Sequence, residues 1–366
     1  MSPPETQFFA TPPRRDQNAT NYSQLDLLNL AANRLPASLA QGGWESALRD
    51  TARRLPQTGK MGLECRLVAN AEVIDLHLPM FRQNDFASLL AHRPREASWG
   101  PLYDLAKACL DKSSALSAGI ATLWIEADRP RPEDNNPPPA VFAGLRASAD
   151  RRRLLPELLD LCAPDLSTRR RQSVLDIAAR VQAAGGRISH LGFMFSRPRQ
   201  PLRINIEGVE GRDLADFLRS IGWTGEVTEF DDLLAALDET AEWIRPALDI
   251  GLGLLPGIGV ELLPLIPANK EAWTRRWLTW MMDRGLCCEE KAAGLMAWPG
   301  VDYPFRPEEP WPDALLVEHL VRQPGRLAML AYGIQHLKLN WQEGICTAKA
   351  YLSMRAYWPE AGKAAE

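Results

Sequence analysis

The chain has 366 residues, of which 46% are hydrophobic and 24% charged, and this composition is typical of a globular protein rather than a disordered or fibrous one. Its net charge of -4 argues against a nucleic acid partner, which would require a basic surface. No apolar run reaches the roughly 20 residues that a membrane-spanning helix needs, and the longest candidate, 247–266, is interrupted by four glycines and two prolines.

The first 20 residues are polar and rich in proline, which predicts a disordered segment ahead of a single domain over residues 21–366. This segment lacks the basic start and the apolar centre of a secretion signal, so we expect a cytoplasmic protein. The six cysteines show no spacing typical of metal ligands. In a reducing compartment we expect them to be free thiols.

The pattern of apolar residues changes twice before residue 100. From about Tyr22 they recur at spacings of three and four, which predicts helices. Residues 63–69 and 73–80 then alternate apolar and polar on either side of a short turn, which predicts a β-hairpin. Helices are expected after it at 85–92 and 102–110.

The same succession of a hairpin and helices recurs four more times along the chain. The predicted hairpins pair residues 121–128 with 141–145, 188–197 with 202–208, 248–255 with 258–264, and 334–341 with 347–354. Helices are predicted between them at 154–162, 173–186, 214–223, 231–244, 271–285, 289–298 and 314–323. A unit that returns every 57–88 residues is a structural repeat, even where no sequence identity remains.

Five hairpins define the fold class. Strands joined by a hairpin pair antiparallel, whereas a TIM barrel needs single parallel strands that are each followed by one helix. We therefore predict an α/β (α+β) fold, in which five ββαα repeats form a closed antiparallel ten-stranded β-barrel with the helices outside. An open sheet with one solvated face would alternate in the same way and remains the alternative.

One face of each predicted strand is apolar, and the other carries charged side chains. Amphipathic helices would cover the apolar faces, so the polar faces would line the interior. Since ten strands enclose more space than side chains alone can fill, we expect a wide, polar chamber of ligand size. Cations from different strands could converge there on one anion such as a diphosphate: Arg66, Arg203, Lys338 and Lys349.

Three further inward side chains suggest chemistry on a carbocation. Trp124 and Tyr351 could shield such a cation with their π faces. Glu64 is a carboxylate beside the cations, and it could orient a nucleophile or accept its proton.

These features resemble the ABBA prenyltransferases, a family that includes the indole and the cyanobactin peptide prenyltransferases. The resemblance in architecture covers residues 60–358. GLECRL (62–67) is similar to the first-strand motif in which a Glu orients the acceptor, which implies that role for Glu64. AKAYL (348–352) resembles the Lys-x-Tyr signature that holds the diphosphate or shields the allyl cation, which implies those roles for Lys349 and Tyr351.

Two other strands carry weaker variants of that signature. LRINI (202–206) and LKLNW (337–341) imply that Arg203 and Lys338 also bind the donor, and Asn205 stands where a Tyr or Lys is usual in the family. The substrate-binding set that the resemblance implies is Arg66, His77, Trp124, Arg203, Asn205, Lys338, Lys349 and Tyr351. Gly251 and Gly253, on the fourth hairpin, would set the length of the prenyl chain.

The resemblance implies a prenyltransferase that ionises an allylic diphosphate, dimethylallyl or geranyl, and stabilises the departing diphosphate with its cations. A nucleophilic side chain of a peptide natural product, or an aromatic small molecule, would then attack the carbocation in a chamber that excludes water. Mg²⁺ bound with the diphosphate is the expected cofactor, and no metal site of the protein itself is predicted.

Two other classes of function remain open. A metal-dependent enzyme would use His77, His190 and His336 with Asp75 or Glu126, although no metal-binding motif surrounds these histidines. A non-catalytic barrel that binds a peptide or another ligand would show the same alternation of strand faces.

Overall fold

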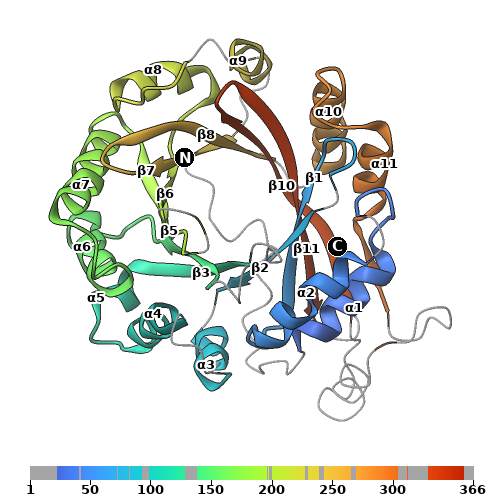
Figure 1. Ribbon diagram of the computed structural model, residues 1–366, viewed down its shortest axis with the longest axis horizontal. Helices are drawn as coiled ribbons and strands as arrows, with labels where there is room; N and C mark the ends of the chain where they lie inside the picture. Colours follow the sequence, from blue (N-terminus) through green and yellow to red (C-terminus); the bar gives the residue numbers. More distant parts are fainter. Residues whose placement is uncertain are drawn as a thin grey trace.

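A computed structural model of the chain shows five β-hairpins that close into one barrel, with helices around it (Figure 1). Each strand pairs antiparallel with the next, and β11 closes the ring by pairing with both β10 and β1. The predicted ten-stranded antiparallel barrel is therefore confirmed, and the open sheet is wrong. The structure describes residues 23–40, 43–71, 73–81, 83–92, 99–127, 138–195, 197, 200–226, 230–238, 243–264, 269–303, 311 and 329–357.

The ring consists of ten strands, and one short strand lies outside it. The ring strands are β1 (Lys60–Arg66), β2 (Ile74–Met80), β3 (Ile120–Ala127), β4 (Ala140–Leu145), β5 (Arg187–Phe193), β6 (Leu202–Glu207), β7 (Trp243–Ile250), β8 (Leu254–Leu263), β10 (Met329–Gln342) and β11 (Ile345–Tyr357). The short strand β9 (Gly300–Asp302) pairs with the first part of β10.

Two helices precede the first hairpin and others lie between the hairpins as predicted, except that the short helix α5 was not predicted. They are α1 (Gln24–Arg34), α2 (Trp44–Arg54), α3 (Gln83–Ala91), α4 (Gly100–Leu110), α5 (Ala115–Gly119), α6 (Arg151–Cys162), α7 (Thr168–Ala183), α8 (Leu214–Ser220), α9 (Asp231–Asp238), α10 (Lys270–Met282) and α11 (Glu289–Ala297). Ser23, Asp150 and Ser167 begin α1, α6 and α7 by accepting a backbone N–H with their side chains, which satisfies one of the free donors of the first turn. The predicted disordered segment 1–20 and the predicted helix 314–323 lie outside the described residues.

The fourth hairpin differs from the prediction at its start and at its turn. The helix predicted over 231–244 ends at Asp238, and Trp243 already begins β7. The run from Trp243 to Ile250 alternates as a strand does, which explains why Trp243 and Ile244 belong to β7 and not to the helix. The turn lies at 251–253, and the predicted Pro-Gly turn at 256–257 lies inside β8.

The main apolar core lies between the barrel and its helices. Outward-facing strand residues such as Leu63, Leu123, Leu191 and Leu339 are at most 1% exposed and pack in one continuous cluster with the helices. Burying each of these side chains contributes about 1.5–3 kcal/mol relative to leaving it exposed. The apolar faces are therefore used for packing, and the polar faces point inward, as the alternation predicted.

Single-residue irregularities interrupt three of the ring strands. The register between partner strands shifts by one residue between Ile120 and Thr122, between Ile188 and His190, and between Ile334 and His336. Such a β-bulge bends the strand and changes the direction of nearby side chains. In each case the residue after the bulge points into the barrel: Thr122, His190 and His336.

Glycines inside the barrel make room for large neighbouring side chains. A Cβ atom at Gly62 would lie 1.9 Å from the His77 ring, one at Gly192 would lie 2.4 Å from the Phe142 ring, and one at Gly259 would lie 2.7 Å from Lys338. These side chains lie across the backbone of the opposite strand and occupy the interior. The space that the glycines leave is thus filled by the protein itself.

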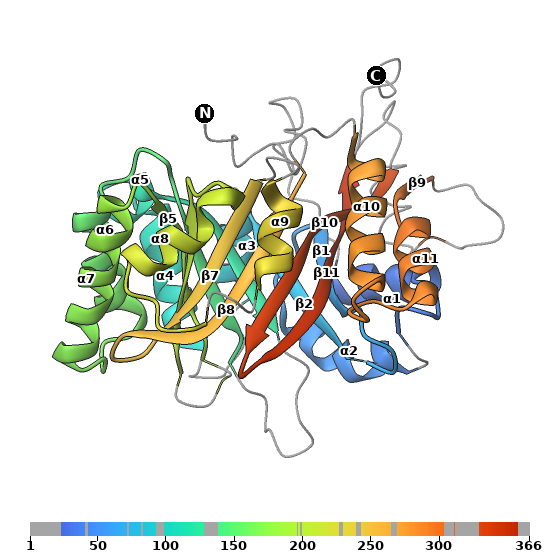
Figure 2. The same cartoon turned by 90° about the horizontal axis from the view of Figure 1, so that it is seen from above.

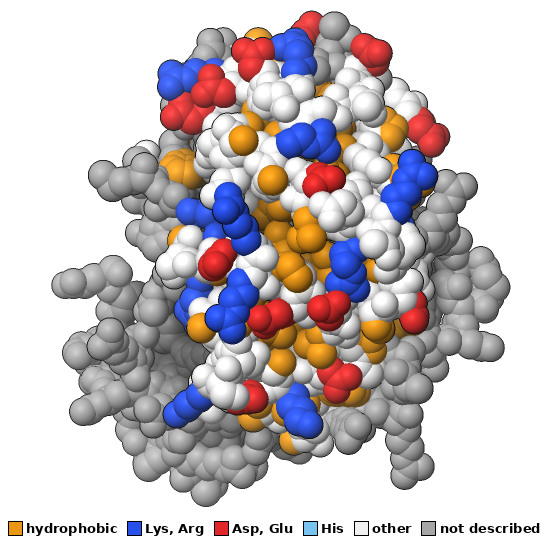
Figure 3. Space-filling model, turned by 90° about the vertical axis from the view of Figure 1, so that its left-hand side faces the viewer, with side chains coloured by type: hydrophobic (Ala, Val, Ile, Leu, Met, Phe, Trp, Pro, Cys, Tyr) orange, Lys and Arg blue, Asp and Glu red, His pale blue; other side chains and the backbone are white. Residues whose placement is uncertain are grey.

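The outer surface is mixed in charge. Figure 3 shows Lys and Arg side chains interspersed with Asp and Glu on one side of the molecule. Two of the arginines on the outer helices pair with acids: Arg153 with Glu157 at 3.3 Å, and Arg171 with Asp160 at 2.6 Å. Figure 2 shows β7, β8, β10 and β11 inclined across the wall of the barrel. Within the described residues, no helix is long and apolar enough to cross a membrane.

The close contact at Gly192 gives a prediction about packing. Gly192→Ala should lower the free energy of unfolding by about 1–3 kcal/mol, because the new methyl group would overlap the Phe142 ring. Gly333→Ala is the matched control, since a Cβ there would meet Ser353 Oγ at an ordinary 3.4 Å. Urea denaturation of both variants measures the difference, and equal stabilities would contradict the prediction.

Candidate active site

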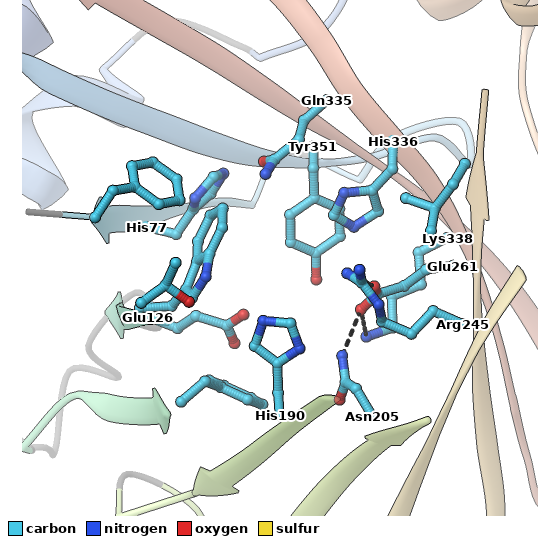
Figure 4. Close-up of a pocket in the computed structure, with 15 residues that line it drawn as sticks. His77, Glu126, His190, Asn205, Arg245, Glu261, Gln335, His336, Lys338 and Tyr351 are labelled. Atoms are coloured by element: carbon cyan, nitrogen blue, oxygen red, sulfur yellow. Dashed lines mark hydrogen bonds and ion pairs between the residues drawn. The ribbon is translucent and has the colours of Figure 1, made fainter. Parts of the chain in front are cut away.

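A pocket at the centre of the barrel is lined by polar and aromatic side chains from most of the ring strands (Figure 4). Its volume is about 80 Å³, which is less than the roughly 150 Å³ that accommodates a benzene ring. The wide chamber predicted from the sequence is therefore wrong in size, because large side chains lie across the interior glycines. The lining residues are His77, Phe81, Thr122, Trp124, Glu126, Phe142, His190, Asn205, Arg245, Glu261, Leu263, Gln335, His336, Lys338 and Tyr351.

Glu64 is held at the pocket wall by two donors from β11. Lys349 Nζ donates to Oε1 at 2.5 Å, and the Tyr351 hydroxyl donates to Oε2 at 2.5 Å. Burial alone would raise the pKa of Glu64, but the charge and hydrogen bond of Lys349, together with the Tyr351 hydroxyl, hold it well below its usual range. Glu64 is thus an ionised carboxylate at neutral pH. Its two hydrogen-bond donors are Lys349 and Tyr351, the residues of the Lys-x-Tyr signature.

A second carboxylate, that of Glu261 on β8, accepts hydrogen bonds from three side chains. Lys338 Nζ donates to it at 3.3 Å, Arg245 at 3.3 Å and the Asn205 side-chain amide at 3.0 Å. Burial would raise the pKa of Glu261, but Lys338 and the other cationic groups hold it well below its usual range. This cluster, rather than free cations, forms one wall of the pocket in Figure 4.

Two more carboxylates outside the pocket, Asp249 and Glu207, form ion pairs with arginines. Arg203 binds Asp249 in a bidentate arrangement at 2.7 and 2.9 Å. Glu207 accepts from Arg245 at 2.8 Å and from Arg187 at 2.5 Å. In the described part of the barrel interior, the five cations therefore each have a carboxylate within 3.3 Å: Arg187, Arg203, Arg245, Lys338 and Lys349.

The cations are nevertheless close to one another. Burial lowers the pKa of Lys338, and although Glu261 opposes this, the charges of Arg203 and Lys349 lower the pKa further. Because these positive charges lie close together, an anion near Lys338 would be attracted by several of them at once.

Aromatic rings line the rest of the pocket, beginning beside Lys338, whose Nζ lies 5.9 Å from the centroid of the Tyr351 ring. His336 stacks on Tyr351 with 4.2 Å between ring centroids, and His77 lies 5.6 Å from Tyr351 and 5.8 Å from Trp124. Phe142, Met194 and Ala140 form a small apolar cluster inside the barrel, with Trp124 packed against it. The pocket thus has a charged wall and an aromatic wall, which suits a ligand with one polar and one apolar end.

Three histidines line the pocket, as the metal-enzyme hypothesis required, but they do not form a metal site. Within the described residues, no group of three or more His, Cys, Asp or Glu side chains is arranged to hold a metal ion. Burial lowers the pKa of His77 and His190 to about 4 and that of His336 to about 3. The three rings are therefore neutral at physiological pH.

The structure brings together most of the residues predicted from the sequence, but not all of them. His77, Trp124, Asn205, Lys338 and Tyr351 line the pocket. Glu64, Lys349 and Arg203 lie next to it through their ion pairs.

The other three predicted site residues lie elsewhere. The Arg66 side chain, 41% exposed, pairs with Asp75 at 3.5 Å and does not line the pocket. Gly251 and Gly253 lie in the turn between β7 and β8, at one end of the barrel, because this turn comes earlier than its Pro-Gly sequence indicated. The hypothesis that these two glycines limit the prenyl chain therefore lacks its structural basis.

Sequence reasoning missed Arg245 and Glu261 as site residues. Arg245 fell in the gap between the helix predicted over 231–244 and the strand predicted from Leu248, although it alternates with Ile244 and Leu248 as an inward residue would. Glu261 is the one charged residue of its strand, flanked by Val260 and Leu262. A lone acid between two buried apolar residues is the signal that could have found it.

Comparisons with known proteins agree with this architecture. By sequence, no known protein family matches the chain, and no curated protein matches it. By structure, it resembles the crystal structure of the prenyltransferase PriB in its apo form, with a TM-score of 0.51 over 91% of this chain and 94% of that chain, at 12% sequence identity. The chain has the fold of the ABBA prenyltransferases. Since one fold can host several functions, an ABBA fold by itself leaves the reaction to be argued from the pocket.

The neutral histidines predict how the stability of this ABBA barrel depends on pH. An unfolded histidine has a pKa near 6.5, so between about pH 6.5 and 4 the unfolded chain binds more protons than the folded one. The free energy of unfolding should therefore fall as the pH is lowered through this range, with a slope that approaches three protons, or about 4 kcal/mol per pH unit, near pH 5.

Urea denaturation at several pH values between 7 and 5 measures this slope, and this range lies above the pH at which most carboxylates of the unfolded chain become protonated. His77→Gln should reduce the slope by about one proton, because one buried imidazole is lost. A wild-type slope below one proton would contradict the proposed neutrality of the three rings.

Proposed function

We propose that this protein is a prenyltransferase that moves a dimethylallyl or geranyl group from its diphosphate to an electron-rich aromatic ring, either of a small molecule or of a peptide side chain. The observation that carries the proposal is the pairing of a cation cluster with an aromatic wall in one barrel. Lys338 and Arg245 line the same pocket as Trp124 and Tyr351, and Lys338 Nζ lies 5.9 Å from the centroid of the Tyr351 ring. The ABBA fold, shared with the prenyltransferase PriB, supports the same assignment.

The donor diphosphate would bind at the charged wall. It would replace Glu261 as the partner of Lys338 and Arg245, and these cations would stabilise the negative charge that develops as the diphosphate leaves. Arg203 and Lys349 do not line the pocket, but their charges act on Lys338. The diphosphate would therefore be attracted by more positive charges than it contacts.

Mg²⁺ fits this arrangement as a companion of the diphosphate. When the diphosphate takes the cations, Glu261 would remain as a buried carboxylate without its partners, which is costly. A Mg²⁺ ion that arrives with the diphosphate would supply the missing positive charge, and carboxylate oxygens are suitable ligands for it. We therefore propose that donor binding is stronger in the presence of Mg²⁺.

The aromatic wall would receive the prenyl group. Tyr351, stacked on His336, together with Trp124 and His77, offers ring faces that stabilise an allylic cation and keep water away from it. Glu64 holds the Tyr351 hydroxyl and Lys349 in place. Its role in this proposal is to position these two side chains.

A non-catalytic binding barrel is the second candidate, and one observation favours it. Within the described residues, the interior cations are all matched by carboxylates, and the pocket of about 80 Å³ must enlarge before a donor and an acceptor can enter together. A barrel that binds a small or cationic ligand would not require this rearrangement.

Donor binding distinguishes the two candidates. Calorimetry with the unreactive analogues dimethylallyl and geranyl S-thiolodiphosphate, with and without Mg²⁺, should show Mg²⁺-dependent binding. Lys338→Gln should weaken it about 10- to 100-fold, since one charge-assisted contact to the diphosphate is lost. Arg153→Gln, on the outer face of α6, is the control and should leave binding unchanged.

Binding of neither analogue to the wild type would overturn the transferase proposal and favour the binding barrel. Thermal unfolding of the Lys338→Gln variant shows whether a loss of binding reflects loss of the fold.

A further inference from the structure

His190 lies directly after a β-bulge in the wall of the pocket. Ile188 is opposite Ile206 and His190 is opposite Asn205, so Ser189 is an extra residue in β5. Neighbouring residues of a regular strand point to opposite faces of the sheet, but a bulge changes these directions. As a result, the Ser189 hydroxyl and the His190 ring are in contact, with 3.1 Å between Oγ and Nδ1.

This contact fixes which ring nitrogen carries the proton. Ser189 Oγ also donates to the backbone carbonyl of Asn205 at 3.2 Å, and a hydroxyl has one hydrogen to donate. Both bonds can form at the same time only if Oγ accepts the hydrogen on Nδ1. Nε2 is therefore unprotonated, and its lone pair is available to accept a proton.

The surroundings of the ring leave Nε2 open to the pocket. Figure 4 shows the His190 ring extending from β5 towards the pocket centre, between Glu126 and Asn205 and facing Tyr351. A Cβ atom at Gly144, on the neighbouring strand, would lie 3.1 Å from Nε2. The Thr122 hydroxyl occupies that space, because the same Cβ atom would overlap Thr122 Oγ1, so a substrate would reach Nε2 from the pocket centre.

Glu64, the inward carboxylate that could accept a proton from the nucleophile, is poorly suited to that role. Both of its carboxylate oxygens are engaged at 2.5 Å, one by Lys349 and the other by Tyr351. Accepting a proton would break at least one of these bonds inside the barrel, where the donor left behind would lack a partner.

The other two histidines of the pocket lack the feature that orients His190. Within the described residues, neither His77 nor His336 has a side-chain hydrogen-bond partner, and His336 is held flat against Tyr351. Their tautomers are therefore not fixed by a side chain as that of His190 is.

We propose that His190, through Nε2, is the base that removes the proton from the prenylated ring of the acceptor, and that Ser189 is its positioning residue. This inference rests on the prenyltransferase function proposed above. A ring carbon of the acceptor forms a bond to the allylic carbon, and the C–O bond to the diphosphate breaks, with its electron pair leaving on the diphosphate. The proton of the attacked ring carbon then moves to Nε2, and the electrons of its C–H bond return to the ring.

The charges around His190 are consistent with this role. Burial is the main cause that lowers its pKa to about 4, Arg245 and Lys338 act in the same direction, and Glu261 and Glu207 oppose them. The ring is thus neutral and ready as a base at neutral pH, with Glu126 beside it as a further carboxylate. A prenylated ring that still holds its extra proton is a strong acid, so a base with this pKa is sufficient.

The tautomer can be tested without any substrate. In ¹⁵N NMR spectra of the histidine-labelled protein near pH 7, His190 should show a protonated Nδ1 and an unprotonated Nε2. His92 is the internal control, because its Nε2 faces the Arg53 carbonyl at 3.0 Å and should carry the proton. Ser189→Ala should remove the preference at His190. A protonated Nε2 at His190 in the wild type would overturn the inference, whatever the protein catalyses.

The chemical step is tested with dimethylallyl diphosphate and ring-deuterated tryptophan or tyrosine. His190→Gln should lower the rate of transfer by about 10²- to 10⁴-fold, the usual contribution of a general base, and raise the isotope effect on kcat/KM above one. The dissociation constant of dimethylallyl S-thiolodiphosphate should stay within about twofold, as the base contributes little to donor binding. Glu64→Gln, the matched control, should leave the isotope effect as in the wild type.

The outcomes separate the two proposals. Undiminished transfer by His190→Gln, or an isotope effect that rises in Glu64→Gln and not in His190→Gln, would overturn the role of His190 and leave the transferase intact. No transfer to either amino acid, with no binding of the donor analogue, would overturn the transferase and the base together.

Discussion

Pairing of buried charges inside the barrel is the constraint on which the rest of this structure depends. A ring of ten strands turns half of its strand residues inward, and an unpaired charge there would cost several kcal/mol. The strand register solves this by placing partners opposite one another: Arg203 faces Asp249, Lys338 faces Glu261, and Arg187 faces Glu207. A slip of one residue in any of these strands would separate a pair and expose an apolar side chain to the interior.

Much of the fold could be predicted from the sequence, because period-two alternation and turn residues are local signals. The five hairpins, the outward apolar faces and the inward position of Tyr351 follow from them. The local pattern failed where two signals competed: Pro256-Gly257 is typical of a turn, yet the chain turns at 251–253. The partners of Glu261 were not predictable, since they depend on the register of three strands and on bulges that leave no clear trace in the sequence.

The charge pairs also relate the fold to its proposed chemistry. A substrate anion would not find free cations in this barrel; it would compete with carboxylates that already hold them. Such competition favours a ligand with more negative charge than a carboxylate, as a diphosphate has. The shared ABBA fold at 12% identity fits this view, because the barrel geometry is retained although few residues are the same.

The pairing of β11 with β1 determines when the barrel can close as the chain is synthesised. Lys349 and Tyr351 are separated from Glu64 by about 285 residues, so the ribosome makes most of the protein before these partners exist. Until then the emerging sheet has two open edges, at β1 and β8, and Glu64 has neither of its donors. Open edges pair readily with other strands, and such distant contacts form slowly. The last hairpin therefore closes the barrel by joining β8 to β1. Truncation of this hairpin would leave an aggregation-prone open sheet.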